Sequence, residues 1–319
     1  MPKVSVLVPV YNASEFLRTA LTSLVNQTLA DIEIICINDG SKDDSLSIIQ
    51  EFAAKDPRIV VLDKTNTGYG DSMNQGIKLA HGEYIGILEP DDYLELNAFE
   101  KLYQLAHWHH ADIVKSNYFL LENGQNRKLE VIHPKDTGKV IYPHDERFVF
   151  RLPPAIWSAI YRREFLLENH LEFLPTPGAS YQDVGFNTKT LALAKRVILT
   201  TDAFLHYRVD NANSSSNSAG KIQCVPQEYA SIMEFIRQHQ LENLTPTVIG
   251  AKFGNYLWNI LRLPDPAARE FYQTMLTELR TAKAQSLLKR SEFTPRYWLL
   301  AQAMLHAPKL TEKILARML

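Results

Sequence analysis

The chain has little cysteine and no long hydrophobic run. Only two of its 319 residues are cysteine, Cys36 and Cys224, and neither has the spacing of a metal ligand. This favours a reducing compartment over a secreted scaffold linked by disulfides. No apolar run approaches the ~20 residues needed to span a bilayer. The N-terminal residues lack the features of a signal peptide and resemble a first core strand. We therefore expect a cytoplasmic protein.

An excess of one charge is also absent, because 34 basic and 36 acidic residues leave a net charge of −2. This balance gives no reason to expect a nucleic acid as a partner. With 45% hydrophobic residues the chain has enough apolar material for a core, which excludes disorder. The charge is uneven, however. Residues 280–319 carry eight basic and two acidic side chains, so this tail has a charge of +6 and the rest −8.

No Gly-x-Gly-x-x-Gly motif and no glycine-rich loop with basic residues follow the first apolar run. These absences disfavour a dehydrogenase and a nucleotidyltransferase. The first half instead alternates short β-rich runs with stretches of helical periodicity, the first helix having Ser14 as candidate N-cap and the second starting at Asp43 or Asp44. This repetition predicts an α/β fold with a doubly wound, mainly parallel sheet flanked by helices. The predicted strands are residues 4–8, 32–37, 59–62 and 84–88.

The second half is predicted from the same signals. We expect helices at 95–110 and 183–194, a hairpin turn at Asn123-Gly124, and helices almost throughout beyond Val225. The polar residues 211–220 indicate a mobile loop, and we place a domain boundary near 221. The expected domains are 1–220, with halves of about 1–92 and 93–220, and a helical region 221–319. Further strands are expected at 113–120, 197–200 and 203–207.

Polar clusters follow each of the first four predicted strands. They are Tyr11-Asn12, Asn38 to Ser41, Asn66 to Gly70, and Glu89-Pro90-Asp91-Asp92. Ligands of parallel sheets gather at the carboxyl ends of the strands, so these clusters predict one site. The last cluster has three carboxylates in four residues, which repel one another unless a cation lies between them. Hard oxygen ligands suit Mg²⁺ or Mn²⁺. The alternative is an acidic turn that caps a following helix.

The ordered motifs resemble those of family 2 glycosyltransferases with the GT-A fold. The resemblance covers about residues 3–210, and Gly68-Tyr69-Gly70, residues 177–183 and His206-Tyr207-Arg208 resemble a bacterial branch that makes surface polysaccharide. It implies an inverting transfer from a nucleotide-sugar, favouring a UDP-sugar, to a glycan or lipid-linked acceptor in capsule, exopolysaccharide or lipopolysaccharide synthesis. The four general motifs are residues 4–12, Asn38-Asp39-Gly40-Ser41, Glu89-Pro90-Asp91-Asp92 and Gln182-Asp183.

The resemblance also implies roles for individual residues. Asp91 would ligate Mn²⁺ or Mg²⁺, with His206 completing the metal shell, although a buried histidine satisfied by protein is an equal alternative. Asp92 would contact the ligands of the metal and not the metal itself, or it would cap a helix. Asp39 would accept the N–H of a uracil-like base, with an ordinary Asp-Gly turn as its alternative. The nucleotide-sugar contacts would come from Pro9, Tyr11, Asp39, Gly68, Glu89 and Arg208, the last as a clamp on the diphosphate.

Asp183 is the candidate general base. One carboxylate that removes the acceptor's proton suffices for direct displacement with inversion. Gln182 stands where the family usually has Glu, and could bond the acceptor. Because this neighbour is neutral, we expect the pKa of Asp183 to stay near ~3.9. The alternative is an Asp that merely caps a helix.

Departures from the family pattern keep a second function open. Asn38 replaces an acidic residue, which weakens the identification of the base, and Ser72-Met73-Asn74 lacks a common arginine, which removes a candidate phosphate contact. The two departures that keep the second function open are Glu89, in place of the usual Asp, and Gln182, in place of the usual Glu. The alternative is therefore a catalytically impaired relative that binds sugar nucleotides or acts as a scaffold. In the basic tail, residues 294–319 place aromatic and aliphatic side chains beside Lys and Arg, which predicts peripheral contact with the inner face of the plasma membrane. The alternative is a helical bundle that packs on protein or forms a homodimer.

Overall fold

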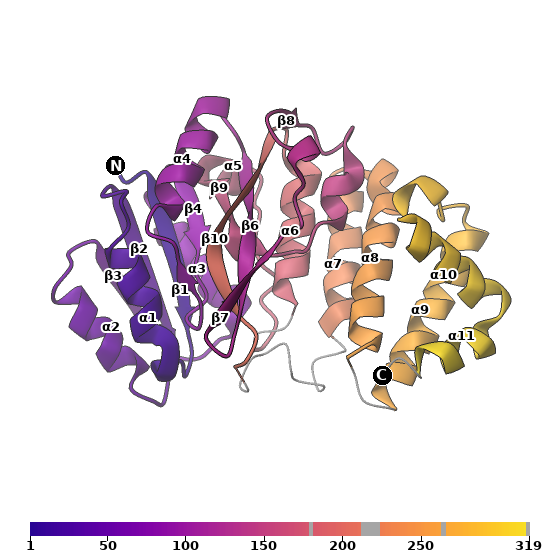
Figure 1. The fold of residues 1–319 in the computed structure, drawn as a ribbon, viewed down its shortest axis with the longest axis horizontal. Coiled ribbons are helices and arrows are strands. Elements are labelled where there is room, and N and C mark those ends of the chain that lie inside the picture. Colours follow the sequence, from indigo (N-terminus) through magenta and orange to yellow (C-terminus); the bar gives the residue numbers. More distant parts are fainter. Residues whose placement is uncertain (179–180, 212–223, 263–265, 317–319) are drawn as a thin grey trace. The chain divides into compact units, whose positions relative to one another are not determined.

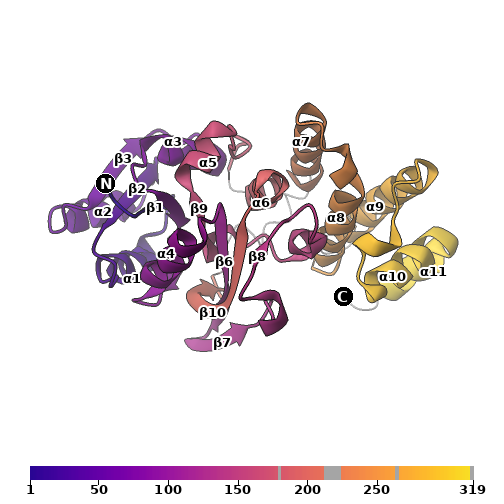
Figure 2. The same ribbon diagram turned by 90° about the horizontal axis from the view of Figure 1, so that it is seen from above.

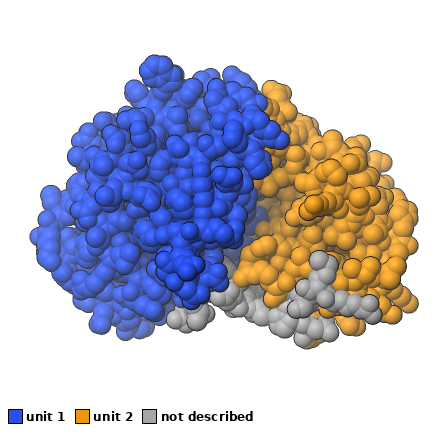
Figure 3. Space-filling model, viewed as in Figure 1, with its two compact units in different colours: residues 1–143, 153–216 blue, residues 144–152, 217–319 orange. Residues whose placement is uncertain are grey.

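The structure is a computed structural model that describes residues 1–178, 181–211, 224–262 and 266–316. It divides into two compact units (Figure 3). Unit 1 comprises Met1–Pro143 and Pro153–Ser216, and unit 2 comprises His144–Leu152 and Asn217–Leu319. Most of the predicted mobile loop, from residue 212 on, and the predicted boundary near 221 lie outside the described residues.

Unit 1 is built on one sheet, whose strands run in the order β3-β2-β1-β4-β9-β6-β10-β5, with β7 beside β6 and β8 beside β10. The strands β1 to β4 are parallel, and β6 and β10 run the same way because β9 is antiparallel to both β4 and β6. The prediction of a mainly parallel sheet is confirmed. The strands are β1 Val4–Val10, β2 Ile32–Asp39, β3 Ile59–Lys64, β4 Tyr84–Ile87, β5 Tyr93–Leu94, β6 Ile113–Glu122, β7 Gln125–Leu129, β8 Val140–Ile141, β9 Ala159–Arg162 and β10 Val197–Arg208.

Helices flank this sheet (Figures 1 and 2). All seven residues of β1 are buried, as expected of a strand covered on both faces. On α1 the buried side chains include Leu17, Leu21 and Leu24, at the helical spacing that the sequence indicated. The helices of unit 1 are α1 Ser14–Val25, α2 Ser45–Ala53, α3 Tyr69–Leu79, α4 Ala98–His109, α5 Arg163–Glu168 and α6 Gln182–Leu193.

Two helix starts differ from the prediction. Ser14 does not cap α1, since the N-cap is Ala13 and neither side chain satisfies the first turn. The N–H groups of Ala13 and Ser14 instead donate to Ser45 Oγ (2.9 Å) and Asp43 Oδ2 (2.9 Å), which come from the next strand–helix loop. Likewise, α4 starts at Ala98 after the N-cap Asn97, so the acidic turn caps no helix there.

The predicted hairpin is confirmed, because Asn123 and Gly124 have φ angles of 50° and 75° and join the antiparallel strands β6 and β7. The two strands expected at 197–200 and 203–207 form the single strand β10, whose register with β6 shifts between Thr200 and Ala203. This irregularity explains why the apolar pattern is interrupted there.

Unit 2 is helical, as predicted for the region beyond Val225. Its core includes Tyr256 of α8 and Phe271 and Met275 of α9. The segment His144–Leu152 belongs to this unit, and its Arg147 donates to the carbonyl oxygen of Asn243 (3.0 Å). Among the described residues, no helix combines the length and the apolar character needed to cross a membrane. The helices are α7 Cys224–Gln238, α8 Thr245–Ile260, α9 Ala267–Ala284, α10 Pro295–His306 and α11 Pro308–Leu315.

Asn74, a buried residue of α3, holds the segment around Phe173 against this helix. The Asn74 amide donates to the carbonyl oxygen of Phe173 (2.9 Å), and the N–H of Phe173 donates to Asn74 Oδ1 (2.8 Å). Both bonds are buried, so each satisfies a backbone group that would otherwise be unpaired. Phe173 in turn stacks on Phe186 of α6 with ring centroids 4.0 Å apart. Asn74 therefore connects α3 to the segment that leads into α6.

We expect Asn74→Leu to lower the free energy of unfolding of unit 1 by about 3 kcal/mol, because two buried backbone groups of Phe173 lose their partners. Calorimetric unfolding measures this change. The control is Asn26→Leu, since Asn26 is exposed and its amide bonds only the carbonyl oxygen of Thr22 in the same helix. Equal losses of stability in the two variants would contradict the role of Asn74.

Candidate active site

The strands β1, β2, β3, β4, β6 and β10 all end at the same edge of the sheet, and most of the predicted site residues lie there. Pro9 is buried within β1, and Tyr11 follows that strand with 52% of its surface exposed. An exposed aromatic ring at this edge is free to stack on a planar ligand. Neither Pro9 nor Tyr11 has a charged group, so the charges at this edge of the sheet come from other residues, such as its carboxylates.

Asp39, at the end of β2, organises the loop after β3. Its Oδ1 accepts the N–H of Thr67 (2.9 Å), its Oδ2 accepts the N–H of Gly68 (2.9 Å), and Lys64 forms an ion pair with it. A carboxylate has about four lone-pair sites, so Asp39 keeps capacity to accept one more donor. The residue is buried beside an ammonium group, which compensates its charge.

At Gly68, which the sequence predicts as a nucleotide-sugar contact, and at Gly70, another part of the chain approaches the backbone closely. A Cβ at Gly70 would lie 2.2 Å from the carbonyl oxygen of Leu174, and one at Gly68 would lie 2.9 Å from the nitrogen of Gly178. The N–H of Tyr69 also donates to the carbonyl oxygen of Gly178 (3.1 Å). These glycines thus bring residues 174–178, which precede α6, against the start of α3.

The acidic turn after β4 holds its three carboxylates in different surroundings. Glu89 Oε1 accepts the hydroxyl of Tyr69 (2.7 Å). Asp92 is fully buried and its Oδ1 accepts the N–H of Arg208 (2.8 Å), so it anchors the end of β10 and does not cap a helix. Asp91 is partly exposed, and its Oδ2 accepts the side-chain amide of Asn211 (2.8 Å). Glu89 is partly exposed as well, so of the three carboxylates Glu89 and Asp91 can be reached by a ligand and Asp92 cannot.

Arg208, the predicted clamp on the diphosphate, lies against this turn. Its Nε donates to the carbonyl oxygen of Asp91 (3.1 Å), and its guanidinium lies 4.4 Å above the ring of Phe16. A second contact joins it to Asp210 of its own strand end (3.4 Å). The guanidinium is therefore held in place by backbone and ring, and its bidentate face remains suited to a diphosphate.

Burial and the nearby negative charges raise the pKa values of Glu89 and Asp92. The pKa of Glu89 rises to about 8, chiefly through burial and then through the nearby charges of Asp91 and Asp183, against the opposing hydrogen bond from Tyr69. Burial and the charge of Asp91 also raise the pKa of Asp92 well above its usual range. A site that holds carboxyl groups in this way favours a cation.

Asp183 occupies the first turn of α6, whose N-cap is Tyr181, so the capping alternative is wrong. Its Oδ1 accepts the N–H of Val184 (2.9 Å). Burial raises the pKa of Asp183 to about 6, and the charge of Lys115 opposes the rise. The expected value near ~3.9 is therefore wrong, because burial outweighs the benefit of a neutral neighbour. A pKa near neutrality suits a general base.

Gln182 is buried, and its amide donates to Thr176 Oγ1 (2.9 Å) and to the carbonyl oxygen of Gly178 (3.1 Å). These bonds secure the segment that packs on Gly68. The contact of Gln182 with an acceptor stays a prediction.

The structure does not bring His206 to Asp91 as a ligand. Its Nδ1 lies 2.7 Å from Asn126 Oδ1 and its Nε2 lies 2.9 Å from Glu95 Oε1. The ring is buried and stacked between Tyr93 and Phe119. With both nitrogens engaged, neither can ligate a metal in this conformation, and the satisfied-histidine alternative describes the arrangement. The predicted metal role would require these bonds to break.

Sequence reasoning missed two residues beside Asp183. Tyr69 is half-buried between Glu89 and the aromatic ring of Phe173. Lys115, on β6, is buried, and its pKa falls to about 7 through burial. A lysine within the apolar run 113–120 was the available signal, because a charged side chain in a strand covered on both faces needs a reason to be buried.

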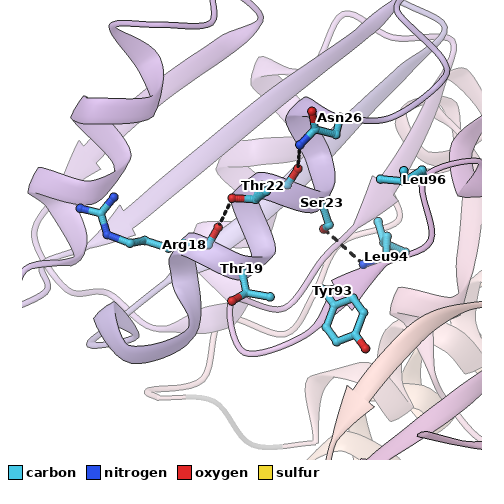
Figure 4. A pocket seen from close by; sticks show the side chains of 8 residues that line it. All are labelled: Arg18, Thr19, Thr22, Ser23, Asn26, Tyr93, Leu94 and Leu96. Carbon is cyan, nitrogen blue, oxygen red and sulfur yellow. Dashed lines mark hydrogen bonds between the residues drawn. The ribbon is translucent and has the colours of Figure 1, made fainter. Parts of the chain in front are cut away.

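A hollow of about 460 Å³ lies elsewhere, between α1 and β5 (Figure 4). In it Ser23 Oγ accepts the N–H of Leu94 (3.2 Å). None of the predicted site residues lines this hollow, so it is separate from the edge described above. Its lining residues are Arg18, Thr19, Thr22, Ser23, Asn26, Tyr93, Leu94 and Leu96.

The acidic turn fits a hard divalent cation that is shared with a ligand. Within the described ranges no three His, Cys, Asp or Glu side chains form a ready-made metal cage. Mg²⁺, however, is usually held by one or two carboxylates together with water and substrate phosphates. Asp91 offers such a carboxylate, and the buried Asp92 Oδ2 has no hydrogen-bonding partner. The residues present thus fit an ion that arrives with a diphosphate.

The fold is that of the GT-A class. The crystal structure of TarS 1-349 of S. aureus in complex with UDP-GlcNAc superposes with a TM-score of 0.71 at 17% identity, over 99% of this chain and 89% of that chain. The mannosyltransferase PcManGT of Pyrobaculum calidifontis, in complex with GDP-Man and Mn²⁺, gives a TM-score of 0.54 at 16% identity, over 98% and 86%. At these identities the likeness concerns the fold alone.

The sequence identifies the family. The profile described as glycosyl transferase family 2 matches residues 5–178, and the chain belongs to that family. The glycosyltransferase EpsJ of Bacillus subtilis is 33% identical over 222 residues, 67% of this chain and 63% of that protein. The poly(ribitol-phosphate) beta-glucosyltransferase of Bacillus spizizenii is 32% identical over 211 residues, 65% of this chain and 32% of that protein. The match with EpsJ thus spans less than two thirds of EpsJ's length.

We expect Glu89→Gln to stabilise the metal-free protein at pH 8 and to have little effect at pH 5. A carboxyl whose pKa is raised to about 8 in the folded state binds more protons than the unfolded chain between about pH 4.5 and 8, so wild-type stability falls as the pH rises through this range. The amide of Gln cannot ionise and avoids that loss.

Melting temperatures measured in EDTA between pH 5 and 8.5 test this. The variant should melt about 3 °C or more above the wild type at pH 8. A difference that is the same at every pH would show that Glu89 does not titrate in this range.

Proposed function

We propose that this protein is an inverting, metal-dependent glycosyltransferase that moves a hexosyl or N-acetylhexosaminyl group from a UDP-sugar to a glycan or lipid-linked acceptor in bacterial cell-envelope polysaccharide synthesis. The observation that carries the proposal is the gathering of Asp39, Asp91, Arg208 and Asp183 in the one unit that carries the family's profile. The donor proposal is supported by TarS, whose structure contains UDP-GlcNAc, and by the glucosyltransferase named above.

Each residue has a distinct task in this proposal. Tyr11 stacks on the base and Asp39 accepts its N–H, while Arg208 holds the diphosphate. Asp183 accepts the proton of the acceptor hydroxyl as its oxygen attacks the anomeric carbon from the face opposite to the leaving diphosphate. The bond to the diphosphate breaks in the same displacement, which inverts the configuration. A Mg²⁺ or Mn²⁺ ion on Asp91, when bound, neutralises charge on the departing phosphates.

A catalytically impaired relative is disfavoured by the surroundings of Asp183. The two departures that raised this alternative were Glu89 and Gln182. Gln182 supports the segment before α6, and Asp183 keeps a pKa close to neutral, as a working base requires. Glu89 keeps a carboxyl group at the position of the usual Asp. The alternative remains an outcome of the experiment below.

The enzyme assay uses UDP-GlcNAc and UDP-glucose with Mn²⁺ and detects release of UDP. We expect Asp91→Asn to lower turnover by about 100-fold or more and to abolish the effect of Mn²⁺ on UDP binding. Asp183→Asn should lower turnover similarly while leaving UDP affinity within about twofold, because it touches only the acceptor side. Wild-type turnover should decline below about pH 6, where Asp183 takes up a proton.

Asp202→Asn is the matched control, because Asp202 is an exposed carboxylate of β10 outside the site. UDP-sugar binding without turnover in the wild type would favour the impaired relative. Turnover that survives in Asp183→Asn would remove this residue from the role of base.

For a lipid-linked acceptor, we propose that residues 294–319 contact an anionic membrane surface. On α11, Leu310 and Ile314 are 61% and 51% exposed and stand one turn apart, next to the exposed Lys309 and Lys313. Apolar side chains flanked by lysines on one helix face suit the boundary between headgroups and acyl chains. Each lysine near an anionic leaflet adds about 1 kcal/mol.

We expect the double variant Leu310→Ser/Ile314→Ser to bind phosphatidylglycerol vesicles about tenfold less than the wild type, measured by co-sedimentation. Leu79→Ser, at an exposed leucine of α3 in unit 1, is the control and should bind as the wild type does. Unchanged binding in the double variant would reject the membrane contact. Loss of a dimer in the same variant would assign this face to a second copy of the chain.

A further inference from the structure

A buried ion pair joins the ends of β2 and β3, and the proposed reaction does not yet use its cation. Lys64, the last residue of β3, pairs with Asp39, the last residue of β2. The two side chains are only 10% and 7% exposed, and Nζ of Lys64 donates a hydrogen bond to Oδ1 of Asp39. A buried ammonium group and a buried carboxylate are each unfavourable unless an opposite charge compensates them. Each of these two groups therefore depends on the other.

The ammonium group of Lys64 directs its donors at the protein. It has three N–H bonds. Besides Asp39 it donates to Thr67 Oγ1 and to the carbonyl oxygen of Thr65 (3.5 Å). The hydroxyl of Thr67 in turn donates to Asp71 Oδ2, which lies 3.4 Å from Nζ of Lys64. Lys64 is thus held between Asp39 and the loop after β3, and it reaches a ligand only through Asp39.

The contacts of Asp39 leave one place for a ligand. Its Oδ1 accepts both Lys64 and the N–H of Thr67 (2.9 Å), which fills the two lone pairs of that oxygen. Its Oδ2 accepts the N–H of Gly68 (2.9 Å). Among the described residues no other group donates to Oδ2, so one lone pair of this oxygen stays open.

One open lone pair on a carboxylate is enough to distinguish two pyrimidine bases. Uracil has an N–H at ring position 3, which can donate to Oδ2. Cytosine has a ring nitrogen there that only accepts, so two acceptors would face each other. This discrimination requires an ionised Asp39, because a protonated carboxyl group is also a donor. The positive charge of Lys64 favours the ionised form of its buried partner.

We propose that Lys64 is a positioning residue that determines the nucleobase, because it fills Oδ1 of Asp39 and keeps this carboxylate an acceptor for the N–H of a uracil-like base. The inference rests on the proposed function, since it states how the nucleotide-sugar site of that reaction selects its donor. Lys64 itself touches no ligand.

Calorimetric titration with UDP and with CDP, both in the presence of Mn²⁺, measures this selection. We expect the wild type to bind UDP about 100-fold more tightly than CDP. Lys64→Met should lower this ratio by about tenfold, by weakening UDP and not CDP, because the buried carboxylate loses its counter-charge. Lys64→Gln, which keeps N–H donors without the charge, should act in the same way and serves where Lys64→Met does not fold. An unchanged ratio in a folded neutral variant would overturn the inference.

Two further variants control for a general loss of stability. Lys64→Arg retains the charge and should keep the ratio near that of the wild type. Lys252→Met removes a partly buried lysine that pairs with Glu278 (2.6 Å) in unit 2, so it also loses an ion pair but should leave the ratio unchanged. A lowered ratio in Lys252→Met would show that lost stability, and not the contact with Asp39, changes the selection.

A double-mutant cycle in UDP binding tests whether Lys64 acts through Asp39. The double variant Lys64→Met/Asp39→Asn should bind UDP within about twofold of Asp39→Asn alone, because the residue through which Lys64 acts is already changed. Additive losses would show that Lys64 acts on the nucleotide by another route and would overturn the positioning role.

The failure of this inference can be told from that of the proposed function. A wild type that binds neither nucleotide and turns over no UDP-sugar overturns the proposed donor, and the inference with it. A wild type that turns over a UDP-sugar, with the same UDP-to-CDP ratio in Lys64→Met, overturns the inference alone.

Discussion

The repulsion between carboxylates at one edge of the sheet is the constraint on which the rest of the site depends. The charges of Asp91 and Asp183 both act on Glu89 and, with burial, raise its pKa. Such an arrangement is unfavourable for folding by itself, because each group would be more stable in water. The chain compensates it locally with the hydroxyl of Tyr69, the backbone N–H of Arg208 and the ammonium of Lys115. A bound cation would complete this compensation only when a ligand is present.

The strands β1, β2 and β4 could be predicted because each is buried on both faces, so an apolar run of four to eight residues identified it, and the partly exposed edge strand β3 still carries the apolar run 59–62. Because these strands are parallel, the sequence also predicted which edge of the sheet carries the site. Helix starts were less predictable, because the groups that satisfy α1 come from Ser45 and Asp43 in another loop. A local capping rule applied to Ser14 cannot detect a cap supplied by tertiary contact.

The residues of the site likewise include some that the sequence could predict and some features that it could not. Asp39, Asp91, Arg208 and Asp183 lie in motifs of fixed order, so the sequence could name them. The pKa of Asp183 could not be predicted from its neighbour Gln182, because the burial that raises it depends on how distant parts of the chain pack around α6. The contacts of His206 with Glu95 and Asn126 are equally non-local.

The glycines before α3 show how the fold links the two halves of the site. Because Gly68 and Gly70 have no side chains, residues 174–178 can pack on the loop that bonds Asp39. The same segment is held at Phe173 by Asn74, and at its other end Gln182 bonds Thr176 directly before Asp183. Asp39 and Asp183, which we propose as the base-binding and the catalytic carboxylate, are thus connected through packed backbone. Rigid packing of this kind fixes the distance between the two carboxylates. In the proposed reaction one of them meets the base of the donor and the other meets the hydroxyl of the acceptor, and a flexible connection could not hold them at a fixed distance.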